Sequence, residues 1–331
     1  MLVLFLNIWY NNNMDIKELF AKSHTFKIVS SDTKSGMINH SYMLISADTM
    51  LMREYAKLVA STFLCSSGHK PCGECVVCRR ISHGNYSDVI TYPQGDKAIM
   101  TEDINEIVLD ELVLPLEADK KIYILYDFDK ATVQAQNKLL KTLEEPSKSV
   151  IFILTATNID NVLPTIRSRS KKIVENILDD NDIAKYLIDT GVAKSDAVEI
   201  ASRSFGNLTY AVSHAGSKSS RQIIELSKKI FNEMQDSSMV LKYASLMLNH
   251  KDNLEEVINQ MFISVNQMIK EISLKQNSGT YNLSMYNVQS LLGISKLCEL
   301  AVKKIKANCN PNSVVDGLLM GILEVRYKCT R

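Results

Sequence analysis

Two continuous apolar runs, residues 121–126 and 150–154, dominate the hydrophobic pattern of the chain. Residues 131–145 between them have a helix-like pattern, and Pro146 ends this helix because proline cannot continue the hydrogen-bond ladder. A strand that is apolar at every position is buried on both faces, and a single helix between two such strands is typical of neighbouring parallel strands. The stretch therefore predicts the centre of an α/β domain with a parallel sheet.

The same pattern predicts the remaining helices and strands and a change from α/β to all-helical structure along the chain. Further strands are expected at residues 41–46, 88–92 and 171–174. Helices are expected at residues 53–64 and 101–114, the second with Thr101 as its N-cap. After residue 174 the pattern is helical, with short amphipathic helices over 179–235 and longer ones at 241–273, 288–306 and 313–327. The fold class is thus α/β followed by all-α.

Composition narrows the class of protein. The chain has 331 residues, 46% apolar and 23% charged, which is typical of a folded globular protein with two or three domains. Its 38 basic and 37 acidic residues give a net charge of +1, which argues against strong autonomous binding of nucleic acid. A local basic patch is still compatible with this net charge. Residues 1–13 are largely apolar but too short to span a bilayer, and they lack the features of a signal peptide. We expect them to form a disordered extension, with a docking peptide as the alternative, on a cytoplasmic protein without a membrane partner.

Four of the seven cysteines lie within fourteen residues, in the spacing C-x6-C-x2-C-x2-C. A C-x2-C step brings two sulfurs onto one ion, and four thiolates complete a tetrahedral zinc shell. The predicted ligands of a structural zinc are Cys65, Cys72, Cys75 and Cys78. His69 is an alternative ligand, and Lys70, Arg79 and Arg80 lie near enough in sequence to favour thiolates. Seven cysteines in a chain of this length, four of them clustered, indicate a reducing compartment and a metal and not a secreted disulfide scaffold.

The string Asn-Lys-Leu-Leu-Lys-Thr-Leu-Glu-Glu-Pro at 137–146, followed after a strand by Arg-Ser-Arg at 167–169, resembles the bacterial clamp-loader branch of the AAA+ superfamily. The resemblance implies an AAA+ parallel-sheet domain at 14–176 with a zinc module inserted at 65–78. It also implies a helical lid domain at 177–236 and a helical collar, used for oligomerisation, at 237–331.

The resemblance also indicates that the nucleotide site has degenerated. The strand-to-helix turn after residue 45 has no glycine to expose phosphate-binding N–H groups, and Asp48 would repel phosphate. The family's lysine and magnesium-binding hydroxyl correspond to Met52 and Arg53, and its catalytic Asp-Glu pair corresponds to Tyr126 and Asp127. Its lid arginine corresponds to Thr209. The degenerate positions are therefore Ser46, Thr49, Met52, Arg53, Tyr126, Asp127 and Thr209, and we expect the chain to bind no ATP.

The resemblance retains one catalytic feature, an arginine finger, with Arg169 preferred over Arg167. The family presents an arginine finger here to the ATP of a neighbouring subunit, and Ser170 replaces the family's usual cysteine. The simpler interpretation is a solvated basic loop at 167–172 that contacts DNA phosphate.

Three functions compete at this stage. The first is a non-catalytic clamp-loader subunit, with gamma/tau-type ATPases and a delta-type subunit as partners and with primed DNA and the sliding clamp reached through the complex. The second is an active gamma/tau-type ATPase, which the loss of three nucleotide motifs argues against. The third is a stand-alone zinc-dependent nucleic-acid-binding protein, which the balanced charge and long helical tail argue against.

Overall fold

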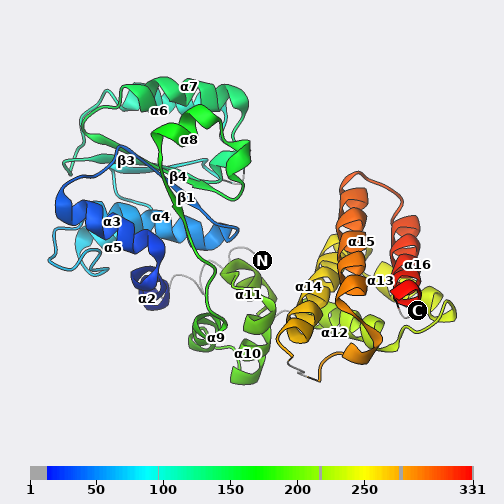
Figure 1. The fold of residues 1–331 in the computed structure, drawn as a ribbon. Coiled ribbons are helices and arrows are strands. Elements are labelled where there is room, and N and C mark those ends of the chain that lie inside the picture. Colours follow the sequence, from blue (N-terminus) through cyan, green and yellow to red (C-terminus); the bar gives the residue numbers. More distant parts are fainter. Residues whose placement is uncertain (1–12, 96, 216–217, 276–278, 330–331) are drawn as a thin grey trace. The chain divides into compact units, whose positions relative to one another are not determined.

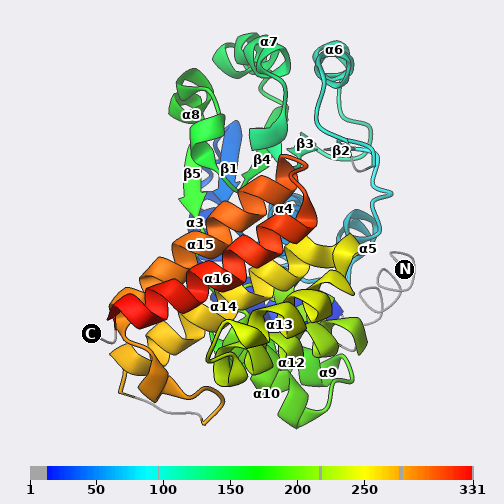
Figure 2. The ribbon, with the colours of Figure 1, turned by 90° about the vertical axis from the view of Figure 1, so that its right-hand side faces the viewer.

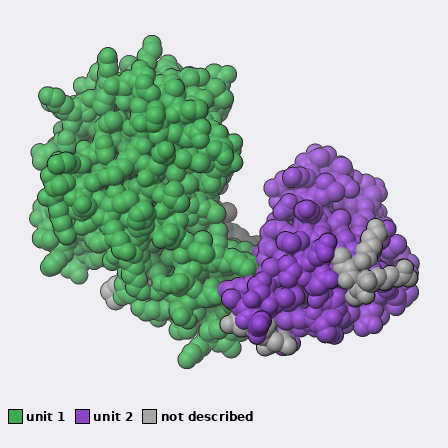
Figure 3. Space-filling view, viewed as in Figure 1, with its two compact units in different colours: residues 1–215 green, residues 216–331 purple. Residues whose placement is uncertain are grey.

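The computed structural model describes residues 13–331 except 96, 216–217, 276–278 and 330–331. The chain forms two compact units, residues 1–215 and residues 216–331 (Figure 3). The expected N-terminal extension lies outside the described residues, apart from its last residue, and the expectation for it stays a prediction. Among the described helices, none has the length and apolar character needed to cross a bilayer.

The first unit is built on a five-stranded parallel sheet, in the order β2-β3-β4-β1-β5 (Figures 1 and 2). The strands are β1 (Ser41–Ile45), β2 (Val89–Tyr92), β3 (Lys121–Leu125), β4 (Val150–Ala156) and β5 (Lys171–Val174). β3 and β4 are neighbours with Ile124 opposite Ile153, which confirms the prediction made from the two apolar runs. β1 lies between β4 and β5.

Helices cover both faces of the sheet, and successive strand residues point to opposite sides, as the pleat requires (Figure 1). Ile122 and Ile124 belong to the core on one face, whereas Tyr123 and Leu125 belong to the core on the other. The first face carries α2 (Asn13–Lys22), α3 (His24–Ser35) and α4 (Thr49–Leu64), with α5 (Val76–Ser82) packed on α4. The second carries α6 (Thr101–Asp110), α7 (Val133–Glu144) and α8 (Pro164–Arg169). This three-layer arrangement explains why β3 and β4 are apolar at almost every position.

Three short helices complete the first unit on the α4 face. They are α9 (Asp180–Asp189), α10 (Lys194–Arg203) and α11 (Leu208–His214). Ile183, Ala197 and Leu208, one from each helix, are fully buried in the same core as Leu51 and Tyr55 of α4. The three helices are therefore packed on the α/β body.

The second unit consists of helices around a core of its own. They are α12 (Lys218–Glu233), α13 (Ser238–Leu248), α14 (Leu254–Ser273), α15 (Val288–Lys306) and α16 (Pro311–Cys329). The division at 215/216 places α12 in this unit, whereas the sequence assigned its residues to the lid segment. The predicted helix over 241–273 is two helices, because the polar run at 249–253 has no apolar side chain to continue the stripe.

The helix predicted over 101–114 is shorter than expected and starts differently. Its N-cap position is Met100, whose N–H donates to Asp103, so the assignment of Thr101 was wrong. The helix ends at Asp110, four residues before the predicted end. The following N–H groups at residues 116–118 bond to the buried carboxylate of Asp88 instead.

Candidate functional site

The turn between β1 and α4, where a nucleotide-binding protein cradles phosphate, is occupied by a side chain of the chain itself. Asp48 is the N-cap of α4, and its Oδ1 accepts a hydrogen bond from Leu51 N at 3.1 Å. The residue is only 3% exposed. N–H groups at a helix start are natural donors to an anion, and here the Asp48 carboxylate already accepts from one of them.

The same carboxylate also reaches the start of α11. Its Oδ2 accepts from Leu208 N at 2.5 Å and from Thr209 N at 3.3 Å. The Thr209 hydroxyl donates to Asp48 Oδ1 and accepts from Met50 N at 3.2 Å. Thr209, which corresponds to the family's lid arginine, thus contacts the degenerate loop, and Asp48 joins two segments 160 residues apart.

The other degenerate positions also contact one another or lie in the core. Met52 is 1% exposed and belongs to the core. Arg53 Nη2 lies 2.9 Å from Asp127 Oδ2, and its guanidinium carbon lies 5.1 Å from the centre of the Tyr126 ring. Ser46 Oγ accepts from Asp48 N at 3.2 Å. The cation and the acid that could interact with a nucleotide and its magnesium ion are therefore paired with each other.

Tyr126 behaves as an apolar residue in this site. It is 8% exposed, and its hydroxyl has no hydrogen-bond partner within the described part of the chain. Burial raises the pKa of this phenol above its ordinary value, and the nearby Glu54 adds to the effect. A phenol held neutral cannot replace a carboxylate that binds a metal ion.

The four cysteines of the 65–78 segment come together as the spacing predicted. Their Sγ atoms all lie within 4.8 Å of one another. Three of the sulfur–sulfur distances are 3.6 Å (Cys65–Cys72), 4.0 Å (Cys65–Cys75) and 3.9 Å (Cys72–Cys78). Four sulfurs bound tetrahedrally at about 2.3 Å from an ion are about 3.8 Å apart, so the arrangement fits a single tetrahedral metal ion.

Backbone groups favour a thiolate at one of these cysteines. N–H groups of Cys75 and Glu74 lower the pKa of Cys72 to about 6, whereas burial raises the pKa of Cys78. Backbone N–H groups thus favour the thiolate of Cys72. Arg80, which the sequence suggested would favour thiolates, forms its ion pair with Glu117 instead. Outside the cluster, Cys298 is buried and Cys309 exposed, and the side chain of Cys329 is outside the described residues.

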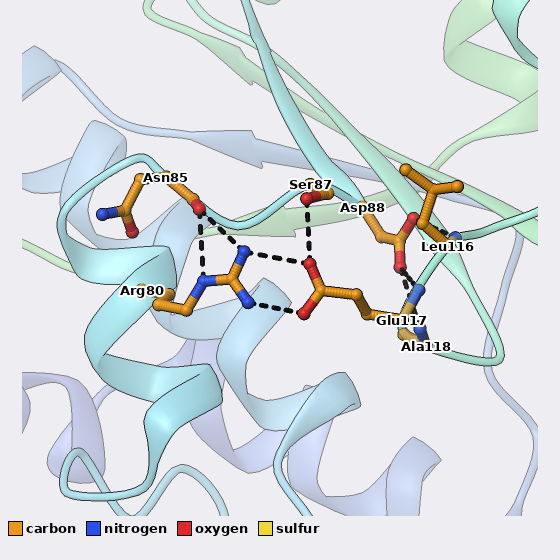
Figure 4. Close-up of polar contacts among 7 residues, drawn as sticks. All are labelled: Arg80, Asn85, Ser87, Asp88, Leu116, Glu117 and Ala118. Atoms are coloured by element: carbon orange, nitrogen blue, oxygen red, sulfur yellow. Dashed lines mark hydrogen bonds and ion pairs between the residues drawn. The ribbon is translucent and has the colours of Figure 1, made fainter.

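Arg80 anchors the cysteine segment to the sheet (Figure 4). It extends from α5, and its Nη2 donates to Glu117 Oε1 at 2.9 Å and to Asn85 O at 3.1 Å. Ser87 Oγ donates to the same Glu117 oxygen at 2.9 Å. Asp88 fixes the chain on either side of Glu117 by accepting from the three N–H groups of 116–118 at 2.7 to 2.8 Å (Figure 4).

The arginine segment forms α8, which begins with Pro164 after β4. Arg169 Nη2 lies 2.7 Å from Glu144 Oε1, and its Nη1 donates to Thr165 O at 3.0 Å. About a third of the Arg169 side chain is exposed, at 34%. Arg167 has a different partner, because its Nη1 lies 3.3 Å from Asp160 Oδ1. The two arginines therefore have separate acidic partners at the surface.

Two residues that the sequence left without a role fix the position of α8. Gln136 of α7 is 2% exposed; it donates to Ala131 O and Asn161 O and accepts from Leu163 N at 2.9 Å. At the other end, the hydroxyls of Ser170 and Ser41 are 2.8 Å apart and buried. The position of Gln136, a polar residue on the apolar face of α7, was the signal in the sequence that could have revealed this role. Nothing local in the sequence indicated the Asp48–Thr209 contact.

Known proteins resemble the first unit most closely. Residues 21–178 match the family described as DNA polymerase III, delta subunit. The DNA polymerase III subunit gamma of Buchnera aphidicola subsp. Schizaphis graminum is 30% identical over 173 residues, which are 52% of this chain and 47% of that protein. The subunit delta' of Bacillus subtilis is 29% identical over 190 residues, 57% of this chain and 56% of that protein. A crystal structure of a gamma subunit-related protein from Thermotoga maritima has a TM-score of 0.45 at 16% identity and covers 90% of this chain and 99% of that one.

Over about half of its length, the chain is therefore similar to the clamp-loader family of AAA+ proteins. It spans about half the length of the first curated relatives that it matches, and these relatives carry the names of both delta' and gamma subunits.

The unsatisfied hydroxyl of Tyr126 gives a first prediction. We expect Tyr126→Phe to leave the free energy of unfolding unchanged or to raise it, because the substitution removes a buried hydroxyl that has no partner. The control is Tyr42→Phe, since the Tyr42 hydroxyl donates to Asp32 at 2.8 Å and accepts from Asn39 N at 3.0 Å. That variant should lose about 1–3 kcal/mol. Urea denaturation followed by circular dichroism measures both, and an equal loss in the two variants would contradict the prediction.

Proposed function

We propose that this chain is a non-catalytic clamp-loader subunit of the delta-prime type. It acts in a complex with gamma/tau-type ATPases and a delta-type subunit, and it helps to load the sliding clamp onto primed DNA. In this proposal the helices after residue 176 supply the lid and the collar, through which the subunits assemble. The chain itself hydrolyses no ATP.

The observation that carries the proposal is the occupied phosphate loop. A nucleotide would need the N–H groups at the start of α4, a free cation at the lysine position and a carboxylate for magnesium. In the chain the buried carboxylate of Asp48 accepts from Leu51 N, the Thr209 hydroxyl accepts from Met50 N, and Met52 lies in the core. Arg53 and Asp127 form an ion pair. These contacts favour the non-catalytic subunit over the active gamma/tau-type ATPase, although relatives carry both names.

Nucleotide binding and assembly test this proposal together. We expect no binding of a fluorescent ATP analogue to the isolated chain, and a heteromeric complex on size-exclusion chromatography with a gamma/tau-type ATPase. The matched control is the ATPase subunit alone, which should bind the analogue. Micromolar binding that is lost on Met52→Ala would support the ATPase alternative, and a monomer that joins no partner would support the stand-alone zinc protein.

In the same proposal, Arg169 is an arginine finger for the ATP of a neighbouring subunit. A guanidinium that neutralises charge on the transferring phosphoryl group needs no nucleotide on its own chain. The ion pair with Glu144 is half-exposed, with 34% and 48% of the two side chains accessible, so giving it up costs little. Gln136 and Ser170 hold α8 in place while the side chain changes partner.

We expect Arg169→Ala to leave folding and assembly intact and to lower the DNA- and clamp-stimulated ATPase of the complex. Arginine fingers in other systems contribute about 10³–10⁵ in rate, and the loss here should be smaller because one of several ATP sites faces this subunit. Arg169→Lys should restore little activity, since lysine lacks the planar fork. The control is Arg167→Ala, two residues earlier on the same helix, which should retain activity. An assembled Arg169→Ala complex with unchanged ATPase would remove the finger role.

The cysteine cluster is proposed to hold a structural zinc ion. The sulfur–sulfur distances of 3.6 to 4.0 Å support four-thiolate coordination, which leaves no position for a substrate. Zinc bound by Cys65, Cys72, Cys75 and Cys78 would fix the segment before α5, which Arg80 then ties to Glu117. The ion supplies stability and no catalytic step.

Elemental analysis should find one zinc per chain in protein purified without chelator. Cys72→Ser should lower the zinc content and the midpoint of thermal unfolding, because the remaining thiolates cannot complete the shell. Cys309→Ser is the control, since this exposed thiol lies outside the cluster. Metal-free protein in which all four cluster thiols titrate freely would contradict the prediction.

A further inference from the structure

Asp48 makes more contacts than the N-cap of one helix requires. Its Oδ1 accepts from Leu51 N in α4 and from the Thr209 hydroxyl, and its Oδ2 accepts from Leu208 N and Thr209 N in α11. All four donors converge on a carboxylate that is 3% exposed. A buried charge is tolerated only when several donors surround it, so these contacts depend on one another.

Neighbouring contacts reinforce this link between α4 and α11. Met50 N donates to the Thr209 hydroxyl at 3.2 Å, and Asn207 Nδ2 donates to Ala47 O at 3.4 Å. Gly206, with φ +77°, allows the turn before α11 to approach the chain that follows β5, where a Cβ would lie 2.7 Å from Leu178 O. The start of α11 is therefore held between the Asp48 turn and residues 177–178.

Two other polar links to the helical segment 180–214 are ion pairs near the surface. Lys22 lies 2.8 Å from Asp182, and Lys185 lies 2.7 Å from Glu18, but both pairs are largely exposed. Exposed ion pairs contribute little to stability, because solvent screens them. Apolar side chains of α9–α11 share one core with those of α4, yet apolar packing is not directional and sets an orientation less strictly than a buried charge with fixed donors.

We propose that Asp48 replaces the nucleotide as the group that fixes the orientation of segment 180–214 on the α/β body. A phosphate would be bound through N–H groups at a helix start and would come and go with the nucleotide. The Asp48 carboxylate uses such N–H groups permanently because it belongs to the chain. The segment is thereby held in one arrangement whether or not ATP is present. This inference deepens the proposed function and rests on it, since it assigns a role to the loop that has lost its nucleotide.

Hydrogen exchange of the full-length chain tests the inference with Asp48→Asn. This change preserves the size of the side chain but removes the charge and replaces one acceptor oxygen with a donor. We expect amides throughout α9, α10 and α11 to exchange about tenfold faster or more, because the segment loosens as one unit. Amides of β1, β3 and β4 should retain their protection.

The matched control is Asp88→Asn, which removes another buried carboxylate with three backbone donors in the same unit. Its effect should be confined to residues near 116–118 and should not reach 180–214. If Asp48→Asn does not yield folded protein, Thr209→Val decides alone, since it removes the hydroxyl between Asp48 and Met50 at nearly constant volume.

Faster exchange confined to the amides of residues 208 and 209 would overturn the inference, because it would reduce Asp48 to a local helix cap. Unchanged exchange across 180–214 would overturn it as well. Addition of ATP to the wild-type chain distinguishes a failure of this inference from a failure of the proposed function. Slower exchange at 46–53 with ATP would contradict the non-catalytic function, whatever the result of the Asp48 variant.

Discussion

The buried carboxylate of Asp48 is the constraint on which the candidate site depends. A charge that is 3% exposed must be surrounded by donors, and the donors at hand are Leu51 N of α4, the first N–H groups of α11 and the hydroxyl of Thr209. Two N–H groups at the start of α4, those of Met50 and Leu51, are thus bonded within the chain. The same hydrogen bonds join the α/β core to the helices that follow it.

The parallel sheet explains why the degenerate positions meet at one place. The carboxyl ends of β1 and β3 lie at the same edge of the sheet, which is where α/β proteins bind ligands. β1 leads to Asp48 and Arg53, and β3 leads to Tyr126 and Asp127. At this edge Arg53 pairs with Asp127 at 2.9 Å.

The other two sites lie on elements that polar contacts fix. The cysteine segment contacts the loop before β3 through the exposed pair of Arg80 and Glu117, and the buried Asp88 holds the backbone of Glu117. α8 is tied to α7 by the buried Gln136 and to β1 by the buried Ser170. In both cases the backbone is fixed by a buried polar side chain, whereas Arg80 and Arg169 have partly exposed acidic partners.

The sequence by itself determined the features that depend on local pattern. The apolar runs at 121–126 and 150–154 specified buried parallel strands, because a strand covered on both faces must be apolar throughout. The cysteine spacing specified the cluster. Only the tertiary structure decided which distant groups meet. Asp48 with Thr209, Arg53 with Asp127, Arg80 with Glu117 and Arg169 with Glu144 are separated by 25 to 161 residues. No periodicity or propensity encodes such pairs, because they follow from how whole helices pack against the sheet.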